Sequence, residues 1–293
     1  MQPVFDTDLL RVRKLRALRA DVTGADFLLR HVLDDLLLRL STIERRFASA
    51  ATLNCLSQAP ARALLESDKI DAIVRLEPDV AFFDGRDVTA AKSVVALPET
   101  LPLADESIDL AISLLSMHET NDTPGFLAQL RRALRPDGLF LAASPGEGTL
   151  AELRTALLAA ETEIAGGAAP RVAPFMDLRV AGALLQRAGF TLPVADAESL
   201  TVRYDTMFDL MRDLRAMGAT SALVERSRAP VGRRLFTRAA EIYAERFSDP
   251  DGRVRATFSF VWLSGWAPHA SQQKPLKPGS AAVSLKQILG DGK

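Results

Sequence analysis

Cysteine is nearly absent from this chain of 293 residues, which contains only Cys55. One cysteine forms no intramolecular disulfide, so the fold depends on its hydrophobic core and suits a reducing compartment. Long apolar runs are missing too, because no stretch approaches the roughly 20 apolar residues of a membrane-spanning helix. We therefore expect a cytoplasmic protein without a transmembrane segment, in which Cys55 is a small buried hydrophobe and not a nucleophile.

A surplus of charge of either sign is also lacking. The chain carries 36 basic and 37 acidic residues, for a formal net charge of -1. No overall field would attract nucleic acid, so we expect no nucleic-acid partner. An arginine run within residues 1–20 is interrupted by Asp6 and Asp8 and is followed by no apolar signal core, which disfavours a cleaved targeting segment.

Histidine is scarce: the chain contains three, which are His31, His118 and His269. They fall in an N-terminal helical stretch, in the middle of the chain and in the C-terminal tail. Non-haem iron sites usually combine two histidines with a carboxylate. The spacing contains no such compact ligand motif, and we predict no metal site.

Glycine does not occur from residue 25 to residue 84. Within that span, ATLNCLSQAPARALL (residues 51–65) is typical of a buried strand that runs into a helix. Nucleotide-binding α/β proteins often have glycines at such a junction, because glycine adopts positive φ and leaves room for the ligand. Leu56, Gln58 and Pro60 occupy this turn, so a cofactor site here has been altered or lost, or was never present.

Three regions are predicted along the chain: an N-terminal helical cap (1–45), an α/β domain with helical insertions (46–268) and an exposed C-terminal arm (269–293). Apolar residues recur at helical spacing in the first region, namely Leu29, Val32, Leu33, Leu36 and Leu40. This stripe indicates helices packed on the main domain, and the alternative is a lid over a ligand cleft. The arm is rich in proline, lysine and serine, as exposed tails often are.

The second region alternates short apolar runs with helical patterns, which is typical of a parallel sheet with right-handed crossovers. The expected strands are ATLNCL, DAIVRLE, SVVAL, IDLAISLL and GLFLAAS, followed later by LTVRY and ATFSFVWLSGWAP. One helix is expected to begin with Thr123 as its N-cap and Pro124 in its first turn. Two later helices are expected to stop at Gly189 and Gly218.

Residues 101–154 carry a recurrent pattern: LP, an apolar strand containing Asp-Leu, a helix and then LRPDGLFL. This order resembles the second half of the class I methyltransferase fold, which binds S-adenosylmethionine (SAM). SMHETND, LFLAASPGEGTLAELR, RYDTMFDLMRDLRAMG and SGWAPHASQQKPLKPGS are most similar to the branch that contains the methyltransferase-like assembly factor of respiratory complex I and its bacterial relatives. The resemblance implies an α/β, Rossmann-like, seven-stranded and mostly parallel sheet, with ATFSFVWLSGW as its one antiparallel strand. It also implies SAM as cofactor, and a protein substrate or respiratory-chain subunit as partner.

The resemblance further implies a cofactor site at the ends of the first four strands. Asn54 takes the usual acidic position after the first strand, and Glu77 at the end of the second would accept hydrogen bonds from the ribose, unless it is a solvated carboxylate. The acid expected at the end of the third strand falls on Leu97, so Glu99 would substitute only if the loop shifts. The full set of expected cofactor contacts is Asn54, Leu56, Ser57, Glu77, Pro98, Glu99, Ser113 and Leu114. A leucine side chain pointing from position 56 into the pocket would fill ligand volume, which argues against ordinary cofactor binding.

His118 is the candidate catalytic residue, because it follows the fourth strand at the edge where open α/β sheets bind ligands. It would act as a general base, and the alternative is a surface histidine at the start of a helix. Four polar residues of the family-like segment either hold a peptide or an acidic group or form ion pairs along a helix: Tyr204, Arg212, Asp213 and Arg215.

Two functions stay open at this point. The first is SAM-dependent modification of a small molecule or a protein side chain, which Glu77 and His118 support. The second is a non-catalytic binding or assembly role without SAM, which the missing glycines and Leu97 support. We predict a methyltransferase-like protein with a degenerate cofactor motif, since a fold alone does not establish an activity.

Overall fold

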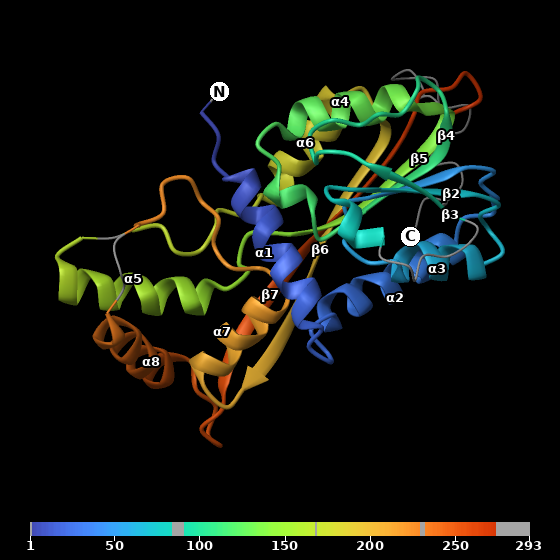
Figure 1. Cartoon of the computed structure of the whole chain (residues 1–293). Coiled ribbons are helices and arrows are strands. Elements are labelled where there is room, and N and C mark those ends of the chain that lie inside the picture. Colours follow the sequence, from blue (N-terminus) through green and yellow to red (C-terminus); the bar gives the residue numbers. More distant parts are fainter. Residues whose placement is uncertain (1, 84–90, 168, 229–231, 274–293) are drawn as a thin grey trace, which may run out of the picture.

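The computed structural model describes residues 2–83, 91–167, 169–228 and 232–273, so most of the expected C-terminal arm lies outside the described residues. Its centre is a seven-stranded sheet in the order β3-β2-β1-β4-β5-β7-β6 (Figure 1). The strands are β1 (Ala50–Leu53), β2 (Ile73–Glu77), β3 (Ala91–Val95), β4 (Ile108–Leu114), β5 (Leu134–Pro145), β6 (Thr191–Tyr204) and β7 (Val254–Trp266). The first five strands run parallel, and β7 pairs antiparallel with β5 and β6. The predicted α/β sheet with one reversed strand is confirmed.

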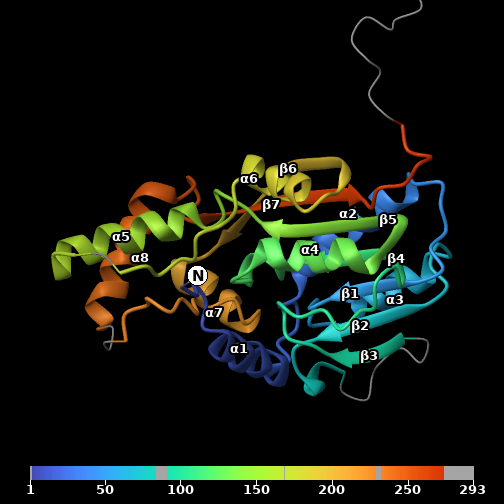
Figure 2. The same ribbon diagram turned by 90° about the horizontal axis from the view of Figure 1, so that it is seen from above.

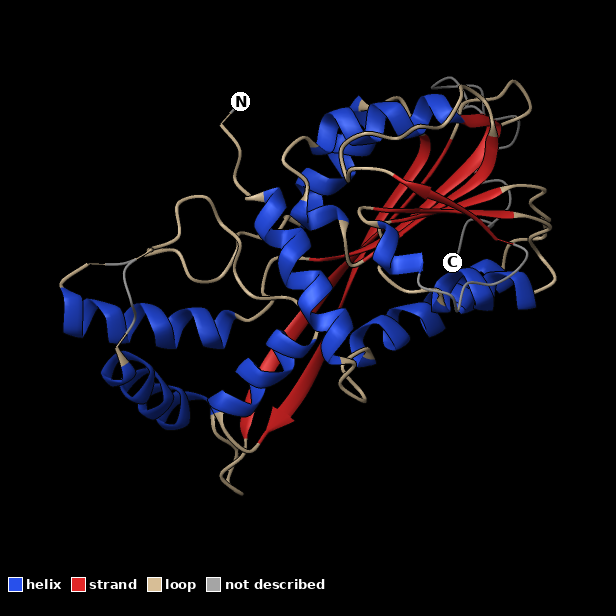
Figure 3. Ribbon diagram, in the orientation of Figure 1, coloured by secondary structure: helices blue, strands red, loops and turns tan. Residues whose placement is uncertain are grey.

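Helices cover both faces of this sheet (Figure 3). They are α1 (Thr7–Ala20), α2 (Phe27–Ser41), α3 (Ala59–Glu66), α4 (Thr123–Ala133), α5 (Ala151–Ala165), α6 (Leu178–Arg187), α7 (Met207–Ala216) and α8 (Arg233–Phe247), with short 3-10 turns η1 (Val80–Phe83) and η2 (Met117–Glu119). Successive residues of β4 point to opposite faces of the sheet. Leu110 and Ile112 pack in the core that includes α2 and α3, and Ala111 packs in the core that includes α4 and α6. β6 and β7 extend past the other strands towards α7 and α8 (Figure 1).

Two helices end where the sequence predicts, and one helix has a different N-cap from the predicted one. Gly189 and Gly218 adopt φ of +86° and +71° just after α6 and α7, as expected for glycines that end helices. The N-cap of α4 is Asp122, whose Oδ1 accepts a hydrogen bond from Gly125 N–H at 2.9 Å, so the prediction of Thr123 was wrong. Thr123 is the first helical residue, and its hydroxyl contacts Thr120 Oγ1 at 3.1 Å.

The N-terminal region consists of two helices: α1 lies near the carboxyl ends of the parallel strands, and α2 begins there and packs along one face of the sheet. Asp6 caps α1 by accepting a hydrogen bond from Leu9 N–H at 3.0 Å, and residues 21–26 turn the chain into α2. In Figure 2, α1 lies beside α7. Their contact depends on Gly218, because a Cβ at that position would lie only 3.1 Å from the Cα of Lys14.

Candidate functional site

Two adjoining cavities lie where the strand order reverses between β1 and β4. The strand-end cavity, of about 440 Å³, is lined by the turn after β1, the end of β4 and residues of α1 and α2. The arginine-lined cavity, of about 350 Å³, lies between α1, α5, α7 and residues 170–175 and 219–227. Residues that line both are Leu28, His118, Pro145, Thr149, Met217, Ala219 and Phe258. This crevice is where open α/β sheets place their ligands, and its volume suits a small molecule.

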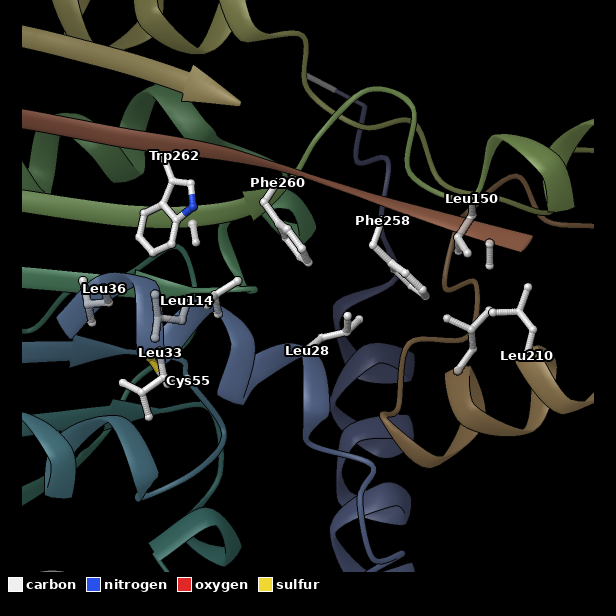
Figure 4. Close-up of a cluster of buried hydrophobic side chains, with 14 of the residues drawn as sticks. Leu28, Leu33, Leu36, Cys55, Leu114, Leu150, Leu210, Phe258, Phe260 and Trp262 are labelled. Atoms are coloured by element: carbon white, nitrogen blue, oxygen red, sulfur yellow. The ribbon is translucent and has the colours of Figure 1, made fainter. Parts of the chain in front are cut away.

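Leu28 and Phe258 mark the boundary between the two cavities. Figure 4 shows their side chains pointing toward each other, with Cys55 and Leu114 on one side and Leu150 and Leu210 on the other. Phe258 also packs edge-on against Phe27 of α2, with ring centroids 6.3 Å apart. The boundary is therefore made by apolar side chains from β7 and α2, and His118 is the polar group beside it.

The turn after β1 adopts a left-handed conformation without glycine. Asn54 has φ of +52° and Leu56 has φ of +57°. Such a conformation costs an ordinary residue about 1–2 kcal/mol, and asparagine tolerates it better. A hydrogen bond from Leu56 N–H to Glu77 Oε2 at 2.9 Å holds the turn, and Ser57 Oγ accepts from Ala59 N–H at 3.1 Å. Asn54, Leu56 and Ser57 all line the strand-end cavity, as Leu114 does.

Glu77 lies beneath this turn and is fully buried. Its Oε1 is 3.1 Å from Nη2 of Arg75, which is also buried and donates to the carbonyl oxygen of Phe82 at 3.2 Å. The Arg75 guanidinium lies 5.2 Å from the centre of the Phe83 ring. Glu77 is thus not a solvated carboxylate, and both of its oxygens contact groups of the protein. Its expected role toward a ribose stays a prediction.

The remaining predicted contacts fall into two places. Ser113 lies under the cavity, where its hydroxyl is 2.9 Å from that of Ser116, which donates to Leu53 O at 3.1 Å and so ties β4 to β1. Pro98 and Glu99 lie in the loop between β3 and β4 and do not line the strand-end cavity. The Glu99 carboxylate accepts from Asn121 N–H, and its carbonyl oxygen accepts from Gln129 Nε2 at 2.8 Å. The adenine contact expected of Glu99 stays a prediction.

His118 is a buried histidine at the junction of the two cavities. Its side chain is 13% exposed, so the alternative of a surface histidine is wrong. Its Nδ1 has no hydrogen-bond partner among the described residues, as is also true of Asn54 Oδ1. Burial lowers the pKa of His118 to about 4; Glu119 opposes this shift, and Lys14 reinforces it. The imidazole is therefore neutral at pH 7 and offers a ring nitrogen to a ligand, although a base with so low a pKa is weak.

Helix α1 closes over the strand-end cavity and is held by several polar contacts. Lys14 Nζ lies 3.1 Å from Glu119 Oε1, and Arg11 Nη1 lies 2.8 Å from Asp79 Oδ2. Asn121 Oδ1 accepts hydrogen bonds from the N–H groups of residues 4 and 5, both at 2.8 Å. Lys14 itself lines the cavity, so this region covers the strand-end cavity as well as packing on the domain, and a role as a lid stays a prediction. Lys14 was not predicted from the sequence, and the basic residues of α1 were the available signal.

The segment around α7, which carries part of the sequence resemblance, forms one of the ion pairs expected along a helix. Arg212 pairs with Asp209 at 2.7 Å on the surface of α7, and Tyr204 is buried. Arg215 instead lines the arginine-lined cavity.

Neither a metal site nor a membrane span is present in the described part of the chain. Within those residues, no three or more His, Cys, Asp or Glu side chains form a group that could hold a metal ion. None of the described helices combines the length and the apolar character needed to cross a bilayer.

Comparison with known proteins identifies the family. Residues 77–142 match the family described as methyltransferase domain. Human mitochondrial arginine-hydroxylase NDUFAF5 is 36% identical over 97% of this chain and 83% of its own length. This chain belongs to the NDUFAF5 family. The NDUFAF5 proteins of Dictyostelium discoideum and Danio rerio are 44% and 42% identical, but the chain matches only 43% and 63% of their lengths.

The NDUFAF5 family shares its fold with methyltransferases, as the sequence resemblance implied. A malonyl-[acyl-carrier protein] O-methyltransferase of Laribacter hongkongensis is 34% identical over 97% of this chain and 98% of its own length. The solved structure of YcgJ from Bacillus subtilis superposes with a TM-score of 0.55 at 14% identity, over 82% of this chain and 99% of YcgJ. The Rossmann-like methyltransferase fold is confirmed.

Proposed function

We propose that this chain takes part in the assembly of a respiratory-chain complex, as a methyltransferase-like protein with a degenerate cofactor motif that holds SAM weakly or not at all. The observation that carries the proposal is the burial of the Glu77 carboxylate against Arg75 and the Leu56 N–H. A ribose needs an acceptor that faces the ligand. Turning Glu77 toward a ribose would remove the carboxylate that faces the buried guanidinium of Arg75, and breaking a buried ion pair is costly.

The turn itself supports the same conclusion. In a glycine-rich turn the backbone comes close to the ligand because no Cβ intervenes. Here Leu56 has a left-handed backbone and lines the strand-end cavity, so its side chain takes up part of the space near the strand ends. After β3, where a carboxylate would receive the adenine amine, Leu97 is 63% exposed and apolar. The residues present therefore do not fit SAM well, and we derive no transfer step through it.

A protein partner and a compartment complete the proposal. The relatives are named mitochondrial arginine-hydroxylases, and the branch that the sequence resembles contains an assembly factor of respiratory complex I. We therefore propose a subunit of that complex as the partner. The buried Cys55, the only cysteine, supports the cytoplasm as the compartment.

Deletion of the gene in the organism that encodes it tests this role. We expect membranes of the deletion strain to lose most of their complex I activity and to accumulate partly assembled complex I on native gels, because a required binding step is missing. The wild-type gene should restore both. Succinate oxidation by complex II is the matched control and should be unchanged. Normal complex I activity in the deletion strain would contradict the proposal.

A further inference from the structure

The arginine-lined cavity has a chemistry of its own. Of the described residues that line it, four are arginines (Arg13, Arg171, Arg215 and Arg226), and the one acidic residue is Glu119. Two helices, α1 and α7, and two loops supply these arginines, so residues far apart in the sequence supply charge of the same sign. A concentration of positive charge around one cavity favours an anionic ligand over a cationic one.

Some of this charge is neutralised inside the protein and some is not. Arg171 pairs with Glu161 at 2.6 Å, and Arg226 pairs with Asp6 at 3.2 Å. The carboxylate of Glu119 is shared between Lys14 at 3.1 Å and the more distant His118 at 3.8 Å. Positive charge therefore exceeds negative charge at this wall even after the ion pairs are formed.

Arg13 and Arg215 supply the surplus. Neither lies within ion-pair distance of a carboxylate among the described residues, and Arg13 donates a hydrogen bond to the carbonyl oxygen of Ser221. Arg13 is only partly exposed, and burial lowers its pKa, with Arg226 and Arg16 lowering it further and Asp6 opposing them. A partly buried guanidinium beside like charge is stabilised by any anion that enters the cavity.

Most of the remaining wall is apolar. It includes Leu10, Leu153, Leu157, Leu214 and Phe236, and in Figure 4 the neighbouring Leu150 and Leu210 lie on the same side of Phe258. The hydroxyl oxygen of Ser221 is buried at this wall without a hydrogen-bond partner among the described residues. Arginines and a hydroxyl combined with an aliphatic surface match a ligand that has one anionic end and one apolar end.

We propose that the arginine-lined cavity binds a small carboxylate carried on an apolar chain, with Arg13 and Arg215 contacting the carboxylate and the leucine-rich wall contacting the chain. The same wall disfavours a cationic ligand in this cavity. The inference goes beyond the proposed function, because it concerns the cavity on the far side of Leu28 and Phe258 from the altered turn and does not require SAM.

Octanoate is a suitable probe because it is a carboxylate on a flexible apolar chain. Calorimetric titration of the full chain with octanoate, octylammonium and octanol should show binding of octanoate only, or at least tenfold more tightly than the other two. A charged hydrogen bond accounts for about a tenfold difference in affinity. Equal or tighter binding of octylammonium would overturn the proposal, and so would the absence of octanoate binding.

Variants locate the binding site within the molecule. Arg215→Gln and Arg13→Gln should each weaken octanoate binding about tenfold, because each removes a charged donor. Arg212→Gln is the matched control: it changes an exposed arginine of the same helix α7 that pairs with Asp209, and it should change the affinity less than twofold. Arg215 is exposed, so its variant should fold even if Arg13→Gln does not. Octanoate affinity unchanged in Arg215→Gln would exclude this cavity.

The outcomes separate this inference from the proposed function. Tight SAM binding together with arginine-dependent octanoate binding would contradict the proposed function and leave the inference standing. Loss of complex I activity in the deletion strain, together with no octanoate binding by the purified protein, would support the proposed function and overturn the inference.

Discussion

Replacing Arg75 with methionine is expected to lower the free energy of unfolding by about 3–5 kcal/mol, because the change breaks the buried ion pair between its guanidinium and the Glu77 carboxylate. Arg75 and Glu77 have side chains that are 1% and 0% exposed, and the atoms that pair are 3.1 Å apart. Methionine keeps most of the side-chain volume, so lost packing contributes little. Urea denaturation followed by circular dichroism measures the change.

Two further variants show whether burial of the charge is the cause. Arg46→Met removes a surface ion pair with Asp71, whose partners are 67% and 56% exposed, and should cost less than about 1 kcal/mol. The double variant Arg75→Met/Glu77→Gln should recover most of the stability lost in Arg75→Met, because it removes the charge and keeps an acceptor for Leu56 N–H. Equal losses of unfolding free energy for Arg75→Met and Arg46→Met would mean that the Glu77 carboxylate does not form a buried ion pair with Arg75.

Acidification is expected to destabilise the protein through His118. Burial lowers the pKa of His118 in the folded state from 6.5 to about 4. As the pH falls below 6.5, the unfolded chain takes up a proton at this residue while the folded protein does not, so stability falls. The loss from this one group, complete near pH 4, amounts to about 3 kcal/mol and is fully regained above pH 6.5.

The contribution of His118 is measured as a difference between proteins, because carboxylates titrate in the same range. Unfolding free energies of wild type and His118→Gln are compared at several pH values from 7 to 4. The variant should lose less stability on acidification. His269→Gln is the matched control, since His269 is exposed and its ring contacts the hydroxyl of Ser271 and no carboxylate among the described residues, and it should follow the wild type. Parallel curves for wild type and His118→Gln would show that His118 is not buried in its neutral form.

Local patterns were enough to predict most of the fold. The apolar runs of β1, β2, β4 and β5 are short and bounded by turn residues, which is the pattern of a parallel sheet buried on both faces. The long edge strand β6 was recognised only at its end, LTVRY. Its earlier half contains Pro193, Asp196 and Glu198, and it lies on the sheet edge with alternate residues exposed, so it lacks a continuous apolar run.

The site was predicted less completely because its properties depend on contacts between distant segments. The position of the glycine-free turn after β1 could be found from the sequence, but the burial of Glu77 against Arg75 could not. Arg75 and Glu77 are two residues apart and so share a strand face, but that spacing alone does not show that both side chains are buried. The burial of His118 depends on α1, more than 100 residues earlier, and on Phe175, whose ring lies 6.0 Å away. No local pattern contains that information.

Calorimetric titration of the purified full chain with SAM, repeated with S-adenosylhomocysteine, tests the central claim most directly. The buried Glu77 and the leucine at position 56 predict a Kd weaker than about 1 mM, which is a standard free energy less favourable than about -4 kcal/mol. A micromolar Kd for either ligand would contradict the account, because it would require the strand-end cavity to recognise the cofactor despite both features.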